Sequence, residues 1–457
     1  MSAHSFDVIV IGAGPAGEVA AGRLGGRGRK VALVEDRLVG GECSYWGCMP
    51  SKALLRPGQA LEEVRRIPGA AEAATGPLDA AAVLARRDDV IHDLDDSGQL
   101  PWIEDRGVRL FRGRGRLTGV REVTVGDDVL TANDAVILCV GTTPSMPPIP
   151  GLAEAAAWSN REITTAEAVP ARLTVIGGGP IGVEMASAWR SLGSAVTLLE
   201  AGPRILSKEE EYASIQVAES LRDHGVTVRE GVTIARVDRD GPGGEVTVTL
   251  EGGEAFAADE LLVAAGRTPQ TGDIGVELVG GTPGEPLEVD DALRVPGHEW
   301  LYVAGDANGR ALLTHVGKHQ ARLAADNVCG ADVRLRPSID PPPRVTFCDP
   351  QVAAVGHTLA SARAAGLNVR AVDAETSGNA GGSFYGRGAA GTSRLVVDED
   401  RRVLVGATFV GAEVQDFVHA ATIAIVAEAT LDDLWHSIAA FPTRSEVWLD
   451  LLQEYGL

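Results

Sequence analysis

The chain has few aromatic residues, few cysteines and no long hydrophobic run, and each shortage excludes a class of protein. Aromatic residues make up only 4% of the 457 positions, which argues against an aromatic-rich β-sandwich. Five cysteines are too few for a secreted disulfide scaffold of this length. The apolar run near the N-terminus, Val8–Ile11, is too short for a signal sequence or a membrane span. We therefore expect a protein of the reducing cytoplasm.

Basic residues are also scarce. Lys and Arg number 41 against 63 Asp and Glu, for a formal net charge of −22. A surface this acidic repels nucleic-acid backbones and anionic lipid headgroups, so we expect neither nucleic acid nor a membrane as a partner. Apolar residues, by contrast, reach 45%, and there are 56 glycines. This composition excludes wholesale disorder and favours an α/β protein with tight turns and closely packed helices.

A strand–turn–helix–strand pattern occurs twice along the chain. The predicted strands cover 6–11 and 30–34 in the first copy and 173–176 and 195–199 in the second, and the predicted helices end near residues 26 and 192. Each turn has glycine at its first, third and sixth positions, and each second strand ends in an acidic residue. The glycines are Gly12, Gly14 and Gly17, then Gly177, Gly179 and Gly182, and the acids are Glu35 and Glu200.

This layout is typical of a dinucleotide-binding fold. The first glycine permits a tight turn, the second lets the backbone approach a pyrophosphate, and the third lets the helix pack closely on the strand. The acid accepts a hydrogen bond from the adenosine ribose. One glycine-rich turn alone is weak support, but two complete copies predict two dinucleotides. A flavin and a nicotinamide are the natural pair for electron transfer.

Two cysteines, Cys43 and Cys48, lie close together between the first acid and the next predicted helix. A regular helix would separate them by roughly 7.5 Å along its axis, whereas a disulfide requires Cα atoms about 4.4–6.8 Å apart. A bond therefore needs a distorted segment, which Gly47 and the pair Gly40–Gly41 permit. Pro50 is suited to the first turn of a helix, whose free N–H groups we expect to lower the thiol pKa.

A zinc half-site and two inert thiols are the alternatives for this pair. The other cysteines are scattered singly and provide no second close pair for a zinc site. Of these, Cys139 at the end of a strand and Cys329 at the end of a helix are expected to be small core residues.

The segment Gly41–Lys52 resembles the active-site signature of the pyridine nucleotide–disulfide oxidoreductase family. The branch is the one that contains dihydrolipoyl dehydrogenase, glutathione reductase and mercuric reductase. The likeness extends over essentially the whole chain. It continues at 177–184 in the NAD-domain motif, at 265–269 and 304–306 in two flavin-fold motifs, and at 346–356 in the opening of the dimerisation domain.

The resemblance implies an α/β fold with two Rossmann-like dinucleotide-binding domains and a C-terminal α+β dimerisation domain. The predicted ranges are 1–150 for the first part of the FAD-binding domain, 151–270 for the NAD(P)-binding domain, 271–340 for the return to the FAD-binding domain and 341–457 for the interface domain. The proline-rich stretch Pro337–Pro343 is interpreted as a linker.

The resemblance also implies catalytic roles. Cys48 is the thiolate that faces the flavin, and Cys43 is the outer thiol that exchanges with substrate. Lys52 pairs with Glu184 near the reactive nitrogen of the flavin; a solvated surface charge is the alternative for Lys52. Glu446 belongs to a C-terminal motif in which it orients a catalytic histidine. No metal ligand is implied.

Cofactor contacts are implied at positions in both folds. Asp306 binds the flavin ribityl chain, unless it is a helix cap, and Glu35 binds the adenosine ribose. The implied positions are Gly12, Gly14, Gly17, Glu35, Lys52, Gly115, Gly141, Asp306, His315, Gly177, Gly179, Gly182, Glu200 and Gly266. A carboxylate at Glu200 favours NADH over NADPH because it repels a 2′-phosphate, although Arg204 could partly compensate.

The C-terminal motif departs from the family pattern. Thiol–disulfide members have His-Pro-Thr-x-x-Glu, contributed by the partner subunit, and this chain has Phe441 in place of the histidine. General acid–base catalysis is typically worth about 10²–10⁴ in rate, so oxidation of a dithiol substrate should be impaired. His419 and His436 are expected to be surface or packing residues rather than substitutes. The Phe441–Pro442 bond is predicted to be cis, as the family's His–Pro bond is.

These observations predict a homodimeric FAD enzyme. Electrons pass from NADH through the flavin and the Cys43–Cys48 disulfide to a small disulfide or another soft electrophile. The alternatives are direct reduction of a quinone or metal ion, and a dihydrolipoyl dehydrogenase-type subunit of a multienzyme complex. Tyr45 and Trp46, between the two cysteines, either line the substrate mouth or pack internally.

Overall fold

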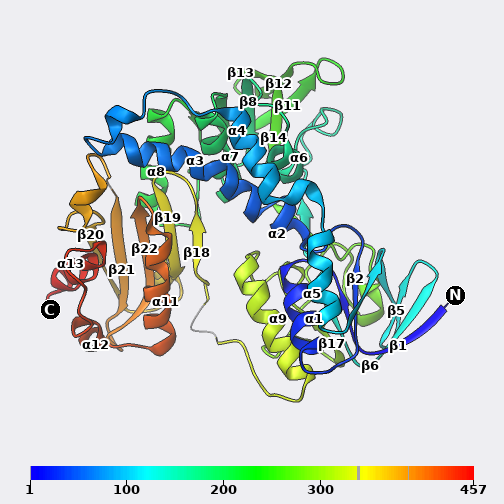
Figure 1. Ribbon diagram of the computed structural model, residues 1–457. Coiled ribbons are helices and arrows are strands. Elements are labelled where there is room, and N and C mark those ends of the chain that lie inside the picture. The colour runs from blue at the N-terminus through cyan, green and yellow to red at the C-terminus, as the bar shows by residue number, and fades with distance from the viewer. Residues whose placement is uncertain (1, 337–339, 390) are drawn as a thin grey trace. The chain divides into compact units, whose positions relative to one another are not determined.

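The computed structural model describes residues 2–336, 340–389 and 391–457 (Figure 1). The contacts within the chain group these residues into two compact units. The first unit contains 2–50, 87–145 and 266–336, and the second contains 51–86, 146–265, 340–389 and 391–457. The predicted domain ranges stay predictions, and part of the predicted linker, Pro337–Ile339, lies outside the described residues.

The first unit is built on a mainly parallel sheet with the strand order β16-β17-β6-β1-β2-β3. Strands and helices of this unit are β1 (Ser2–Ile11), α1 (Pro15–Gly25), β2 (Val31–Glu35), α2 (Gly41–Tyr45), α5 (Leu100–Asp105), β3 (Val108–Arg112), β4 (Gly115–Gly119), β5 (Glu122–Val125), β6 (Asp128–Leu138), β7 (Thr142–Pro144), β15 (Arg267–Pro269), β16 (Arg294–Val295), β17 (His298–Val303) and α9 (Thr314–Val328). Two further helices, α3 (Cys48–Arg66) and α4 (Ala80–Val90), contribute residues to both units.

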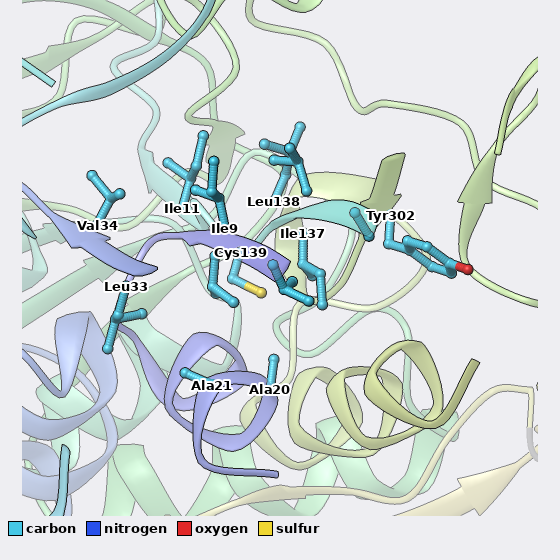
Figure 2. Close-up of a cluster of buried hydrophobic side chains, with 14 of the residues drawn as sticks. Ile9, Ile11, Ala20, Ala21, Leu33, Val34, Ile137, Leu138, Cys139 and Tyr302 are labelled. Atoms are coloured by element: carbon cyan, nitrogen blue, oxygen red, sulfur yellow. The ribbon is translucent and has the colours of Figure 1, made fainter. Parts of the chain in front are cut away.

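The core of this sheet explains the apolar runs in the sequence. β1 lies between β2 and β6 and pairs in parallel with both, so its residues Val8–Ile11 are buried. Figure 2 shows Ile9 and Ile11 with Leu33 and Ile137 from the neighbouring strands and Ala20 from α1. The small side chains on α1 let this helix pack close to the sheet. The first predicted strand–helix–strand unit is confirmed.

The second unit contains a four-stranded parallel sheet, β10-β9-β8-β14, and a five-stranded antiparallel sheet, β18-β19-β22-β21-β20. A three-stranded sheet, β11-β12-β13, completes it. The elements are α6 (Asn160–Thr165), β8 (Arg172–Ile176), α7 (Pro180–Ser191), β9 (Ala195–Leu199), α8 (Glu211–Asp223), β10 (Thr227–Arg229), β11 (Ile234–Arg239), β12 (Val246–Leu250), β13 (Ala255–Ala258), β14 (Glu260–Val263), β18 (Arg344–Thr346), β19 (Gln351–Gly356), α10 (Leu359–Ala364), β20 (Val369–Glu375), β21 (Thr392–Asp398), β22 (Val403–Gly411), α11 (Phe417–Ala427), α12 (Leu431–Trp435) and α13 (Val447–Tyr455).

The second predicted strand–helix–strand unit is present as β8, α7 and β9, and β8 pairs with β9 in parallel. The C-terminal part is a mixture of antiparallel strands and helices, as expected from its β-branched runs and alanine-rich segments. With these strands and helices, the predicted α/β class is confirmed.

In the described residues, no helix is both long enough and apolar enough to cross a bilayer.

Candidate active site

The first glycine-rich turn has the geometry that a pyrophosphate requires. Gly12 has φ +96°, and a Cβ there would lie 2.4 Å from the carbonyl oxygen of Cys139. A Cβ on Gly17 would lie 1.8 Å from the carbonyl oxygen of Gly12, so only glycine lets α1 approach this turn. At Gly14 the nearest atom to a Cβ is the Cα of Gly41, 4.0 Å away. This open space adjoins the start of α1, where no side chain caps the helix, so N–H groups there fit a phosphate.

Glu35 is positioned by the same turn. Its carboxylate accepts hydrogen bonds from the backbone N–H groups of Ala13 (2.7 Å) and Arg37 (2.8 Å). Burial raises the pKa of Glu35, and the two N–H donors oppose that shift. The carboxylate is therefore held rigidly at the end of β2, where it fits the role of a ribose hydroxyl acceptor.

Asp306 lies just after β17 and is part of a polar chain. The hydroxyl of Thr142 donates to Oδ2 of Asp306 at 2.7 Å, and Nε of Arg267 donates to the same hydroxyl at 2.6 Å. Burial raises the pKa of Asp306, whereas Thr142 and the charge of Arg267 lower it. Nη2 of Arg267 also lies 3.7 Å from Oε2 of Glu42. The Asp306 side chain accepts a hydrogen bond from Thr142, which lies far away in the sequence. Asp306 therefore has a role in tertiary structure beyond that of a local helix cap.

The other predicted flavin contacts in this unit differ in their surroundings. A Cβ on Gly115 would lie 2.9 Å from Cγ2 of Ile11, so this glycine allows β4 to pack against β1. Gly141 and Gly266 have φ +70° and +137°, and a Cβ on either would meet no atom closer than 3.8 Å. His315 is exposed in the first turn of α9. The flavin roles of these four residues stay predictions.

The two cysteines flank a break between helices. α2 ends at Tyr45, Trp46 has the non-helical φ of −134°, and α3 begins at Cys48. The predicted distortion is therefore present, and both sulfurs are free thiols. Cys48 Sγ lies 3.4 Å from the hydroxyl oxygen of Thr314 at the start of α9.

The two sulfurs of the pair affect each other's ionisation. The pKa of the Cys43 thiol is raised above its usual value, first because of its hydrogen bond with Cys48 and then because of burial. Two adjacent sulfurs cannot both ionise readily, and the lowering expected for a thiol at the start of the helix, where Cys48 lies, stays a prediction. Thr314 acts in the opposite direction by a hydrogen bond. No pattern in the sequence identified Thr314, although it precedes the predicted His315.

The aromatic residues between the cysteines behave differently from each other. Tyr45 is only 1% exposed, which favours the packing interpretation, while Trp46 is half-buried. Their ring centroids are 5.8 Å apart. A Cβ on Gly40 would lie 2.9 Å from a carbon of the Tyr45 ring, so the glycine at this position makes room for the ring.

Lys52 and Glu184 form an ion pair within the second unit. Lys52 Nζ lies 2.7 Å from Oε2 of Glu184, which is buried. Oε1 of Glu184 accepts from the backbone N–H of Phe347 at 2.9 Å, and Lys52 Nζ lies 4.6 Å from the centroid of the Phe347 ring. These contacts exclude a simple solvated charge. Phe347 was not identified from the sequence.

The second glycine-rich turn repeats the geometry of the first. Gly177 has φ +108°, and a Cβ on Gly182 would lie 1.9 Å from the carbonyl oxygen of Gly177. A Cβ on Gly179 would meet nothing within 4 Å. Glu200 accepts from the N–H groups of Gly178 and Gly202, both at 2.5 Å. This turn therefore also fits a dinucleotide.

Arg204 is committed to its own loop. Its guanidinium donates to the carbonyl oxygens of Leu206 (3.3 Å), Ser207 (3.0 Å) and Glu209 (3.0 Å) and to the hydroxyl of Ser214. An arginine used in this way is poorly placed to bind a 2′-phosphate.

The C-terminal motif exposes an apolar ring. Phe441 is 77% exposed, and the Phe441–Pro442 bond is cis, as predicted. Oε2 of Glu446 is buried and has no hydrogen-bond partner among the described residues. His419 and His436 are exposed. Over 2–336, 340–389 and 391–457, no three His, Cys, Asp or Glu side chains are arranged to hold a metal ion.

Two dinucleotide-binding turns and a thiol pair between helices define the class of this protein as a flavin- and nicotinamide-dependent oxidoreductase. Residues 6–321 match the pyridine nucleotide-disulphide oxidoreductase family, and residues 342–451 match that family's dimerisation domain. The chain belongs to this family. It is an enzyme whose family binds FAD and takes electrons from NAD(P)H.

Relatives in this family have several activities. The chain is 33% identical to dihydrolipoyl dehydrogenase of Thermus scotoductus, over 97% of this chain and 95% of the relative. It is 28% identical to mercuric reductase of Lysinibacillus sphaericus, over 97% of this chain and 81% of the relative. The structure of the Cu(II) complex of the disulfide reductase RclA from Escherichia coli matches with a TM-score of 0.87 at 24% identity, over 98% of this chain and 99% of that one. At this identity, the structural match supports the fold alone.

Proposed function

We propose that this enzyme passes electrons from NADH through FAD and the Cys43–Cys48 pair to a small disulfide or another soft electrophile. The observation that supports this most directly is the thiol pair at the break between α2 and α3, with the two thiols hydrogen-bonded to each other. The dimerisation domain favours a homodimer, and a cycle through two thiols suits the reducing cytoplasm.

The chain's own residues define the sulfur chemistry. FAD, when bound, supplies two-electron transfer between the nicotinamide and sulfur. In the reduced pair, the pKa of Cys43 is raised, first by its hydrogen bond with Cys48, and we assign the thiolate to Cys48. Cys43 then attacks one sulfur of the acceptor disulfide. The acceptor S–S bond breaks, and the leaving thiolate takes the proton that Cys43 gives up. The Cys48 thiolate attacks the Cys43 sulfur, the mixed-disulfide bond breaks, and the second thiolate takes a proton from solvent as the Cys43–Cys48 bond closes.

The donor we propose is NADH rather than NADPH. We assign the Glu200 carboxylate to the adenosine ribose, and a carboxylate there repels a 2′-phosphate. Arg204, the basic residue that could offset this repulsion, is bonded to loop carbonyls and to Ser214.

Lys52 and Glu184 form the ion pair that we assign to the flavin site.

A metal-ion reductase is the second candidate, and the missing base favours it. Attack by Cys43 on a disulfide requires loss of a proton, yet its pKa is raised and Phe441 cannot accept a proton. A soft metal ion displaces thiol protons as it binds and needs no general base. Relatives named mercuric reductase are consistent with such a substrate. The absent base also weakens the interpretation as a dihydrolipoyl dehydrogenase subunit.

Replacement of one thiol separates the routes. In Cys43→Ser, we expect NADH-dependent reduction of glutathione disulfide to fall by more than about 100-fold, because the exchanging sulfur is lost, while benzoquinone reduction is retained. The long-wavelength thiolate–flavin absorption band should persist in Cys43→Ser and disappear in Cys48→Ser. Cys329→Ser is the matched control, because this half-buried cysteine lies at the end of α9. Unchanged disulfide turnover in Cys43→Ser would refute the proposal.

A second variant distinguishes disulfide from metal. Phe441→His restores the family's base, so turnover of a disulfide or dithiol should rise by about 10-fold or more. Reduction of Hg²⁺ or Cu²⁺ should change little. An increase confined to the metal ions would favour the second candidate.

A further inference from the structure

Two consecutive glutamates, Glu209 and Glu210, are buried immediately before α8, with 8% and 5% of their surface exposed. Adjacent carboxylates in such a position require cationic or N–H partners, because desolvation of an unpaired charge is very unfavourable. Both sets of partners come from the C-terminal α+β part of the second unit, far along the chain. The pair therefore connects the nicotinamide-binding fold to the interface domain.

The two connections are well defined. Arg344 on β18 binds Glu209 with two parallel bonds, Nε to Oε1 at 2.7 Å and Nη2 to Oε2 at 2.9 Å. Arg394 on β21 donates from Nη1 to Oε2 of Glu210 at 2.9 Å, and the backbone N–H of Leu359 donates to Oε1 at 2.7 Å. The bidentate contact between Arg344 and Glu209 fixes both the distance and the orientation of the two side chains.

The segment that leads to these glutamates supports the dinucleotide turn. The N–H of Glu209 donates to the carbonyl oxygen of Leu206, and the N–H of Leu206 donates to that of Gly178, both at 2.9 Å. Ile205 packs against the same turn, since a Cβ on Gly178 would lie 2.7 Å from its Cγ2. Gly178 in turn donates to Glu200. A continuous path of bonds thus runs from Arg344 to the acid that we assign to the ribose.

We propose that Arg344 and Arg394 are positioning residues that anchor segment 200–210 and thereby set the affinity for the nicotinamide dinucleotide. The inference rests on the proposed use of NADH at Glu200. When a site is already held in its binding conformation, less of the binding free energy is lost to ordering the site, and the affinity is higher. Loss of an anchor should therefore weaken dinucleotide binding while the flavin-binding turn in the other unit is unaffected.

The test measures NAD⁺ binding to the FAD-loaded enzyme by calorimetry. In Arg344→Met, we expect the dissociation constant to rise by about 10-fold, which corresponds to about 1.4 kcal/mol, with unchanged flavin content and unchanged KM for the acceptor. Arg344→Lys keeps the charge without the paired bonds, so its dissociation constant should lie between those of the wild type and Arg344→Met. Arg401→Met is the matched control. It breaks an exposed ion pair with Glu428 in the same C-terminal part and should bind NAD⁺ as the wild type does.

Each outcome has a clear consequence. Folded Arg344→Met that binds NAD⁺ with wild-type affinity would overturn the inference, as would an equal loss of FAD and NAD⁺, which indicates general destabilisation. If Arg344→Met does not fold, Glu209→Gln keeps the shape of the contact and should raise the dissociation constant by about 3-fold or more; no change would overturn the inference. A wild-type enzyme that binds no NAD⁺ would instead refute the proposed donor.

Discussion

The two dinucleotide-binding turns of this enzyme make the same hydrogen bonds with different side chains around them. Glu35 accepts from Ala13 and Arg37, and Glu200 accepts from the equivalent Gly178 and Gly202. The glycine that allows the helix to approach is equally crowded in both, with Cβ distances of 1.8 and 1.9 Å at Gly17 and Gly182. The backbone geometry is shared, so it does not determine what each fold contributes to catalysis.

The difference lies in what surrounds each turn. After Glu35 the chain continues to the cysteine pair, whereas after Glu200 it continues to Arg204 and the buried Glu209–Glu210 pair. Glu18, which follows Gly17 in the first fold, is a half-buried acid, and the equivalent residue after Gly182 is the fully buried Val183. The first turn is thus followed in the chain by the cysteine pair, and the second is followed by glutamates that bind arginines of the interface domain.

The largest expected effect comes from replacing the glycine that lets the helix pack against the turn, in one fold at a time. Gly17→Ala places a methyl group against a backbone oxygen and should reduce flavin retention by about 10–100-fold, given overpacking costs of about 1–3 kcal/mol. Gly182→Ala should keep the flavin and weaken NADH binding to a similar extent. Flavin absorbance after gel filtration and anaerobic reduction by NADH measure the two losses. Loss of both cofactors in each variant would show that the folds are not independent.

Removing one acid charge should have the next largest effect. A hydrogen bond to a charged group contributes about 1.5–3 kcal/mol, so Glu200→Gln should lower kcat/KM for NADH by about 10-fold or more. The same variant should improve the use of NADPH relative to NADH, because the repulsion of a 2′-phosphate is removed. Glu35→Gln should instead accelerate flavin loss and leave the NADH/NADPH ratio unchanged. Steady-state kinetics with both donors decide this, and an altered ratio in Glu35→Gln would contradict it.

The acid found only in the first fold predicts a pH effect. Burial raises the pKa of Glu18 from 4.5 to about 7. Between these two values the folded protein keeps a proton that the unfolded chain has lost, so stability falls as pH rises from about 4.5 to about 7 and stays low above it. Glu18→Gln should remove this dependence and be more stable than wild type by about 1–3 kcal/mol at pH 8. Denaturant unfolding at pH 5 and pH 8 tests it, with Val183→Ala as a variant that should not change the pH slope.

The smallest expected effect is at Arg204. Because its guanidinium is bonded to loop oxygens, Arg204→Met should weaken NADH and NADPH alike and leave the ratio of their kcat/KM values within about twofold, or about 0.4 kcal/mol. A selective loss of NADPH activity would show that Arg204 reaches the 2′-phosphate.

Local patterns in the sequence were sufficient for the fold class, both turns and the thiol pair. Glycine spacing, strand periodicity and the residue at 441 act over short stretches of chain, because they depend on backbone sterics and on the chemistry of single side chains. The Lys52–Glu184 pair came from the family resemblance rather than from any local pattern. The raised pKa of Cys43 comes first from the neighbouring sulfur of Cys48, a contact that the expectation from the helix end did not include.

What only the tertiary structure decided are the partners brought in from distant segments. Thr314 beside Cys48, the Thr142–Arg267 contact at Asp306, Phe347 beside Lys52 and the arginines that bind Glu209 and Glu210 are all of this kind. Their energies depend on burial and on distances of a few ångströms between residues far apart in the chain. The sequence by itself therefore determined which chemistry this protein carries, and the packing of its strands and helices determined which charges and hydroxyl groups control that chemistry.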